Sequence, residues 1–291
     1  MNKTKIEWVK NPDGSQGYTW NPITGCLNHV NGLCNGGNFP CYAYKLANGR
    51  LKQRYLANEN RGLPAITPGH SEVYRAALDR SNRDPFYPRF WGDRLSKPVE
   101  SPTPQNPAKR KGIFVCDMSD LFGIGIPEIW TEQVMTTIKL CPYHRFYLLT
   151  KQPQNLIKWS PFPENCWVGV TATDYWKYVD ACNYLSQVKA NVKFLSLEPL
   201  LSWDENPQHF FKGSDISWLI IGQQTPVSAK TQPKIEWVRE IVAAADRAGI
   251  RVFLKDNLLP CFGGYPVPKD NIFAYRFSDG AFILRQEMPG D

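Results

Sequence analysis

The sequence contains no long hydrophobic run. Its longest apolar stretches, such as "FYLL" and "WLIIG", are far shorter than the ~20 residues that a membrane-spanning helix needs, so we expect no membrane partner. The first residues, "MNKTKIEWVK", carry charges and a tryptophan, where a secretion signal needs an apolar segment of at least ~7 residues. We therefore expect a cytoplasmic protein, in which thiols stay reduced.

The sequence also has no internal repeat and no strong charge imbalance. Its formal net charge is +7, and its only dense basic run is Lys109 to Lys111. A charge of this size suits either plain solubility or a partner that carries phosphate. Apolar content of 42% and charged content of 21% are typical of a globular protein. We expect one domain over residues 1–291.

From residue 111 onward, apolar strands alternate with helical segments. This rhythm predicts an α/β fold, a full or incomplete (β/α) barrel of about six to seven parallel strands. The predicted strands lie within residues 18–25, 112–120, 144–151, 166–173, 192–199, 216–225 and 251–257, and the predicted helices within 126–141, 153–159, 174–188 and 233–249. The chain divides into a cysteine loop (20–45), an insertion or lid (51–110), repeating β/α units (111–258) and a C-terminal extension (259–291).

Polar residues follow each predicted strand. They are Asp117 to Asp120, Thr150 and Lys151, Thr171 and Thr173, Glu198, Gln223 and Gln224, and Lys255 and Asp256. The carboxyl ends of parallel strands carry the active site in α/β folds, so we expect these side chains to converge. A helix cap or a turn is the alternative for any single one of them.

Three of the eight cysteines, Cys26, Cys34 and Cys41, lie in one short loop, "GCLNHVNGLCNGGNFPC". In a reducing compartment such a group indicates metal binding or catalysis rather than disulfides. Three thiolates can hold three irons of a [4Fe–4S] cluster and leave the fourth iron open, whereas such clusters otherwise take four cysteines. Zinc with His29 or His70 as fourth ligand is the alternative, although the spacing lacks the short Cys-x2-Cys of most structural zinc sites.

Several motifs together carry a family resemblance. "WNPITGC", "CYA", "FVCDMSDLF", "LTKQP", "WVGVTATD", "FLSLEPLL", "WLIIGQQT" and "FLKDN" occur in the order found in the phage-associated three-cysteine-motif family, long described as a domain of unknown function. That family resembles a compact branch of the radical S-adenosylmethionine superfamily. The resemblance implies a partial (β/α) barrel with a [4Fe–4S] cluster after the first strand. It also implies S-adenosylmethionine as cofactor, an electron donor, and reductive cleavage to a 5′-deoxyadenosyl radical.

On this first hypothesis the protein is an enzyme, and its site residues can be assigned. The iron ligands are Cys26, Cys34 and Cys41; the cofactor-binding residues are Tyr42, Ser119, Asp120, Thr171, Glu198 and Gln223; and the catalytic residues are Lys151, Glu198 and Lys255. The two lysines suit an anionic or nucleic-acid-derived substrate, and the alternative for them is salt bridges to Asp120 and Glu198. The chain departs from the family by inserting "NGGNFP" between its last two loop cysteines, and by reading Gly-Gln-Gln-Thr at residues 222–225 where the family has Gly-Gly-Glu-Ser.

A second hypothesis is a nucleic-acid-binding or repair module of a phage or mobile element, with a structural zinc or cluster site. In "NRDPFYPRFWGDRL" the aromatic residues Phe86, Tyr87 and Trp91 stand beside Arg83, Arg89 and Arg94, a combination that can stack on bases and hold phosphates. A packed, amphipathic lid is the alternative. We expect this insertion to lie over the carboxyl ends of the strands with its arginines at the rim, and Lys109 to Lys111 to lie at the amino-terminal face.

Overall fold

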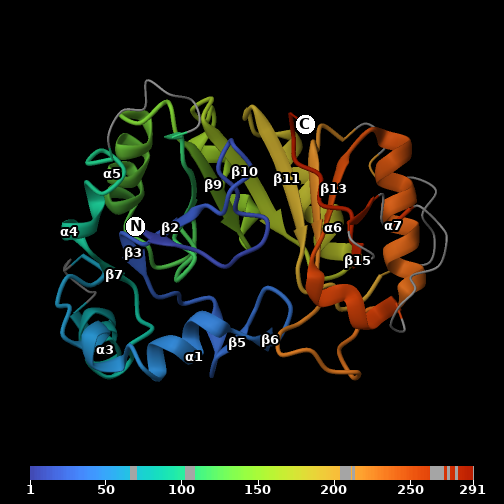
Figure 1. Ribbon diagram of the computed structural model, residues 1–291. Coiled ribbons are helices and arrows are strands. Elements are labelled where there is room, and N and C mark those ends of the chain that lie inside the picture. The colour runs from blue at the N-terminus through green and yellow to red at the C-terminus, as the bar shows by residue number, and fades with distance from the viewer. Residues whose placement is uncertain are drawn as a thin grey trace. The chain divides into compact units, whose positions relative to one another are not determined.

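Figure 1 shows a computed structural model of the chain, which describes residues 1–65, 71–101, 109–203, 211, 214–262, 272–273, 276–278 and 281–290. His70, the second histidine considered as a zinc ligand, lies outside these ranges. The chain forms two compact units. Unit 1 comprises Met1–Asn155 and Pro163–Cys166, and unit 2 comprises Leu156–Phe162 and Trp167–Asp291. None of the described helices is long and apolar enough to cross a membrane.

Unit 1 is built on four strands in the order β1-β2-β8-β9. Their bounds are β1 (Asn2–Lys3), β2 (Tyr18–Trp20), β8 (Gly112–Val115) and β9 (Arg145–Thr150). β1 is antiparallel to β2, and β2, β8 and β9 are parallel. Helix α5 (Glu128–Lys139) follows β8 and has Pro127 at its N-cap, where the missing N–H of proline costs nothing.

Unit 2 has four parallel strands in the order β10-β11-β12-β13. Their bounds are β10 (Cys166–Thr171), β11 (Val192–Leu197), β12 (Trp218–Ile221) and β13 (Arg251–Leu254). Helix α6 (Tyr175–Ser186) begins after Asp174, whose carboxylate accepts from the Lys177 N–H, and α7 (Ile235–Ala248) ends at Gly249 in the left-handed region. α7 packs along β13 (Figure 1). The C-terminal extension adds the hairpin of β14 (Arg276–Ser278) and β15 (Ala281–Ile283).

The prediction of an α/β fold with mostly parallel strands is confirmed. All seven predicted strands are present, and β1 is an added antiparallel strand. The described strand order is linear, so no closed barrel is found. Residues 153–159, predicted as a helix, form only the two 3₁₀ turns η2 (Pro153–Asn155) and η3 (Ile157–Trp159). The segment with helical spacing is too short there to form a helix of more than one turn.

The strands are buried because their residues are apolar on both faces. β8, β10, β11 and β12 have no exposed position, as expected for parallel strands covered on two sides. In unit 1, Trp8 packs on Phe114 and Tyr147 at ring distances of 5.0 and 5.7 Å. In unit 2, Trp218 packs on Trp167 and Phe194 at 5.6 and 5.4 Å. Each unit therefore has an aromatic core of its own.

The region between β2 and β8 adds small elements to unit 1. β3 (Ile23–Thr24) pairs with β7 (Arg89–Phe90), and β4 (His29–Val30), β5 (Leu33–Cys34) and β6 (Phe39–Pro40) form a three-stranded meander. The helices here are α1 (Tyr42–Asn48), α2 (Lys52–Leu56), α3 (Ser71–Arg83) and α4 (Gly92–Leu95). α3 confirms the predicted helical spacing of "SEVYRAALDRS". Lys111 directly precedes β8 and lies 5.0 Å from the Tyr18 ring, at the amino end of the strand as expected.

Candidate functional site

The cysteine loop is fixed to the carboxyl ends of β2 and β8 by its backbone. The Gly25 N–H donates to Met118 O at 2.9 Å, and the Cys26 N–H donates to Phe86 O at 2.9 Å. Gly25 has φ +87, and a Cβ there would lie 2.6 Å from Phe86 O. Only glycine fits both this backbone conformation and this close approach. The glycine of "ITGC" therefore sets the position of the first predicted ligand, Cys26.

The second and third cysteines lie on the meander. Cys34 ends β5 and is buried, whereas Cys41 follows β6 and is the N-cap of α1. The inserted residues "NGGNFP" supply the turn into β6 and β6 itself. The insertion thus lengthens the loop by one short strand that pairs with β5, and Cys34 and Cys41 remain on adjoining parts of the meander.

All eight cysteines are free thiols, and those of the loop influence one another. Burial, and then the nearby charge of Asp120, raises the pKa of Cys26 to about 12, with Cys34 and Cys41 adding in the same direction. Burial also raises the pKa of Cys34, and the positive charge of Lys151 opposes this rise. The Cys26 and Cys34 thiols are protonated at neutral pH, so metal binding must displace their protons and weakens as the pH is lowered.

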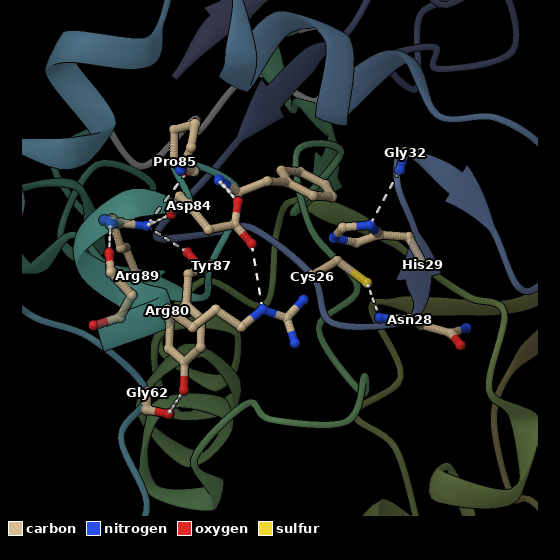
Figure 2. Close-up of polar contacts among 12 residues, drawn as sticks. Cys26, Asn28, His29, Gly32, Gly62, Arg80, Asp84, Pro85, Tyr87 and Arg89 are labelled. Atoms are coloured by element: carbon tan, nitrogen blue, oxygen red, sulfur yellow. Dashed lines mark hydrogen bonds and ion pairs between the residues drawn. The ribbon is translucent and has the colours of Figure 1, made fainter. Parts of the chain in front are cut away.

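Among the described residues, no three His, Cys, Asp or Glu side chains are arranged as a metal-holding group. The donor chemistry nevertheless fits the predicted cluster, because three free thiols lie in one loop. His29 has a buried Nε2 without a hydrogen-bond partner, and its Nδ1 accepts from the Gly32 N–H at 3.3 Å (Figure 2). His29 is therefore the nitrogen donor available to the zinc alternative.

Residues after β8 hold the cysteine loop in place. The Ser119 hydroxyl donates to Gly25 O, and the Tyr42 hydroxyl donates to Asp117 O. Asn21 joins the same two segments, because its Nδ2 donates to Asp117 Oδ1 at 2.6 Å and its Oδ1 accepts from the Met118 N–H at 3.0 Å. Ser119 and Tyr42, predicted to bind the cofactor, thus both contact the protein backbone here, and Tyr42 keeps an exposed ring.

Asp120 is the centre of a buried polar network in unit 1. Its carboxylate accepts from the Thr150 hydroxyl at 2.7 and 2.9 Å, from the Lys151 N–H at 3.0 Å and from the Phe122 N–H at 3.2 Å. These contacts join the carboxyl ends of β8 and β9, as predicted. The Lys151 backbone N–H donates to Asp120, whereas the Lys151 ammonium group lies 6.0 Å from the Phe39 ring of the meander. The Lys151 ammonium is thus directed toward the cysteine loop, where it also acts on Cys34.

Unit 2 places two of the residues predicted to be catalytic, Glu198 and Lys255, at the carboxyl ends of the strands on either side of β12. Glu198, Gly222 and Lys255 follow the paired ends of β11, β12 and β13. Lys255 Nζ forms an ion pair with Glu198 Oε1, and the exposed fractions of these side chains are only 12% and 23%. A Cβ at Gly222 would lie 2.9 Å from Lys255 Cδ and 3.3 Å from Glu198 Cγ. The glycine between them therefore lets the pair form across β12.

Two buried polar atoms near the carboxyl ends of the strands in unit 2 have no hydrogen-bond partner. Gln223 and Asn257 hold each other by hydrogen bonds, including Asn257 Nδ2 to Gln223 O at 2.9 Å and the Gln223 N–H to Asn257 Oδ1 at 3.3 Å. Gln223 Oε1 and Thr171 Oγ1 are nonetheless buried with no hydrogen-bond partner. Buried polar atoms without partners are uncommon and often lie at binding sites. A ligand that donates hydrogen bonds would satisfy both atoms.

The Glu198–Lys255 pair can be tested as a structural interaction. We expect Glu198→Gln and Lys255→Met each to lower the free energy of unfolding by about 1–2 kcal/mol, because each leaves a partly buried charge unpaired. The double variant should lose clearly less free energy of unfolding than the sum of the losses in the two single variants, as measured by denaturant titration. The exposed Lys97–Glu100 pair is the matched control, and its two single losses should simply add in the double variant. Additive losses at Glu198 and Lys255 would show that the pair does not stabilise the fold.

The prediction that Arg89 lies at a substrate rim is wrong. Arg89 is fully buried and donates to Ser81 O at 2.6 Å, Tyr87 O at 2.8 Å, Asp84 O at 3.0 Å and Asn58 O at 3.2 Å. Figure 2 shows its guanidinium directed at the carbonyl groups of residues 84–87. These residues form an irregular loop whose carbonyl groups need donors, and a guanidinium offers five of them. Arg89 is therefore a structural residue.

The prediction that this segment stacks on bases is also wrong for Phe86 and Tyr87. The remaining residues, Trp91, Arg94 and Arg83, contact other parts of the protein. Phe86 and Tyr87 are buried, and the Tyr87 hydroxyl donates to Gly62 O at 3.2 Å, so neither ring can stack on a base. Trp91 donates to Thr24 Oγ1 at 2.8 Å, and the Arg94 guanidinium covers its ring at 3.8 Å. Arg83 alone is well exposed, in an i,i+4 ion pair with Asp79. Packing within unit 1 therefore accounts better for Phe86, Tyr87 and Arg89 than contact with nucleic acid.

The chain matches one family of known proteins. Residues 3–263 match the family model described as "Protein of unknown function (DUF5131)". The chain belongs to this family. No curated protein and no solved structure matches it significantly. The family description assigns no activity, so the function must be argued from the two groups of residues described above.

Sequence reasoning missed several residues that position the site. Asn21, Gly25 and Gly222 carry no catalytic chemistry of their own, and their role depends on close contacts between distant segments. One missed feature did have a local signal. Asn31 and Gly32 have φ 48 and φ 84 and join β4 to β5; an Asn-Gly pair between two short strands is the strongest short-range hairpin signal.

Proposed function

We propose that this protein is a [4Fe–4S] enzyme that binds S-adenosylmethionine, with Cys26, Cys34 and Cys41 as the iron ligands. The observation that carries the proposal is the cysteine loop, in which three free thiols follow a parallel strand and lie close enough that Cys34 and Cys41 both raise the pKa of Cys26. Three cysteine ligands leave one iron for a small molecule. When bound, the cluster would supply the electron for reductive cleavage of the cofactor.

The residues of the chain would then bind and orient the cofactor and the substrate. In unit 1, Ser119 and Tyr42 hold the loop and its surroundings, and the Lys151 ammonium stabilises negative charge near Cys34. In unit 2, Thr171 Oγ1 and Gln223 Oε1 would accept or exchange hydrogen bonds with a polar ligand, beside the Glu198–Lys255 pair. An incomplete (β/α) barrel and an anionic or nucleotide-derived substrate are parts of this proposal. The nucleic-acid module is not developed further, because most of the residues that suggested it are buried.

The test is metal analysis of protein purified without oxygen. We expect about four irons and four sulfides per chain, a thiolate-to-iron charge-transfer absorption, and a change in the electron paramagnetic resonance spectrum of the reduced cluster when S-adenosylmethionine is added. If the spectrum of the cluster does not change when S-adenosylmethionine is added, only a structural or electron-transfer role remains for the cluster. One zinc per chain, no charge-transfer band and loss of zinc in His29→Ala would establish the zinc alternative instead.

A further inference from the structure

The hairpin of β4 and β5 presents an exposed aliphatic pair beside a predicted iron ligand. Val30 and Leu33 lie directly opposite each other and are 62% and 41% exposed, whereas Cys34, the next residue after Leu33, is only 7% exposed. Successive residues of a strand point to opposite faces. A protein bound on Leu33 would therefore be separated from Cys34 by the thickness of a single strand.

The position of this hairpin is well defined. The Cys41 N–H donates to Gly32 O at 2.8 Å, and the rings of His29 and Tyr44 lie 4.9 Å apart. Gly32 lies so close to Tyr44 that a Cβ on it would be 2.5 Å from the ring. Figure 1 shows β5 and β6 next to α1, the helix that carries Tyr44. The hairpin and α1 are thus neighbouring elements that pack against each other.

The segment that contains the hairpin, α1 and α2 carries only positive charge. The sequence has no Asp or Glu between Asp13 and Glu59. Lys45 on α1, Arg50 in the following turn and Lys52 on α2 are exposed, and none of them forms an ion pair within the described residues. Val30, Leu33, Lys45, Arg50 and Lys52 are called the hairpin surface below. An apolar centre with a positive rim fits a negatively charged protein, because complementary charge steers the encounter.

We infer that the hairpin surface binds an acidic electron-carrier protein, which passes one electron to the cluster without forming or breaking a bond. The inference rests on the proposed function, since a cluster that cleaves a cofactor reductively needs an electron from outside. Two exposed aliphatic side chains favour a protein partner over nucleic acid, whose backbone offers charge and whose bases need aromatic platforms. A weak, small interface is typical of such electron-transfer pairs.

The test uses an acidic flavodoxin as probe, in two arms. In the first arm, calorimetry measures binding of the oxidised flavodoxin to the full chain. We expect Val30→Ser/Leu33→Ser and Arg50→Glu/Lys52→Glu each to weaken binding about tenfold, and added salt to weaken it in the parent protein. Ile129→Ser and Lys139→Glu on α5 are the matched controls, because Ile129 is 55% exposed and Lys139 is exposed on the same unit. Both controls should bind like the parent protein.

In the second arm, reduced flavodoxin or dithionite reduces the anaerobic holoprotein in a stopped-flow instrument. The hairpin-surface variants should be reduced about tenfold more slowly by flavodoxin and at the parent rate by dithionite, with unchanged iron content. Equal flavodoxin binding and rates in all variants would overturn the inference, as would an oligonucleotide that binds the same surface while flavodoxin does not. Iron-free protein would refute the proposed function instead, and the binding arm would still decide whether the surface binds an acidic protein.

Discussion

Replacing any one of Cys26, Cys34 and Cys41 by alanine is expected to abolish cluster assembly. Each thiolate would hold one iron, and a cluster left with two protein ligands has no other thiol in the loop to replace the third. Iron content after anaerobic reconstitution should fall from about four per chain to less than about one, and the charge-transfer absorption should disappear. Cys26 and Cys41 are only partly buried in the metal-free chain, so their replacement by alanine should hardly lower its folding stability.

Two controls make this result specific to the loop. Cys261→Ala removes a free, half-buried thiol outside the loop and should leave iron content unchanged. Gly25→Ala keeps all three thiols but places a methyl group against Phe86 O, and should lower iron content by displacing Cys26. If the single cysteine variants keep their iron while Cys261→Ala loses it, the ligand assignment is wrong.

The parts of the fold that sequence reasoning predicted correctly are those fixed by local patterns. β8, β10 and β12 are short apolar runs, and α6 and α7 follow them with helical spacing, a capping aspartate or a terminal glycine. Such elements are specified by residues that are neighbours in the chain. The convergence of Asp117 to Asp120, Thr150 and the cysteine loop also followed from the sequence, because parallel strands bring their carboxyl ends to one edge.

The incorrect predictions concern residues whose role depends on what packs around them. Arg89, Phe86 and Tyr87 have the composition of a nucleic-acid surface, yet the loop that contains them is turned inward and its backbone carbonyls need a buried donor. Lys255 and Glu198 form the ion pair that was the alternative to a catalytic role, because Gly222 leaves room for it; their catalytic role itself stays a prediction. Neither outcome can be derived from spacing alone.

Arg89→Ala is expected to be the most destabilising single substitution in unit 1. It leaves the carbonyls of Ser81 and Tyr87 without a donor and removes one of the two donors to Asp84 O, and each unsatisfied group costs about 1–3 kcal/mol. Burial lowers the pKa of Arg89 to about 10, so its charge is present at neutral pH and its hydrogen bonds are charge-assisted. A loss of ~3 kcal/mol or more in the free energy of unfolding should appear in denaturant titrations.

The same substitution should also lower iron incorporation, because Phe86 O, which accepts from the Cys26 N–H, lies within the loop that Arg89 holds. Arg89→Lys should recover part of the stability, since an ammonium group supplies three donors where the guanidinium supplies five. Arg83→Ala is the matched control: that arginine is exposed on α3 with a single ion pair to Asp79, and its removal should cost less than about 0.5 kcal/mol. An Arg89→Ala protein that folds as stably as the parent, keeps its iron and loses only substrate binding would place Arg89 at the rim after all.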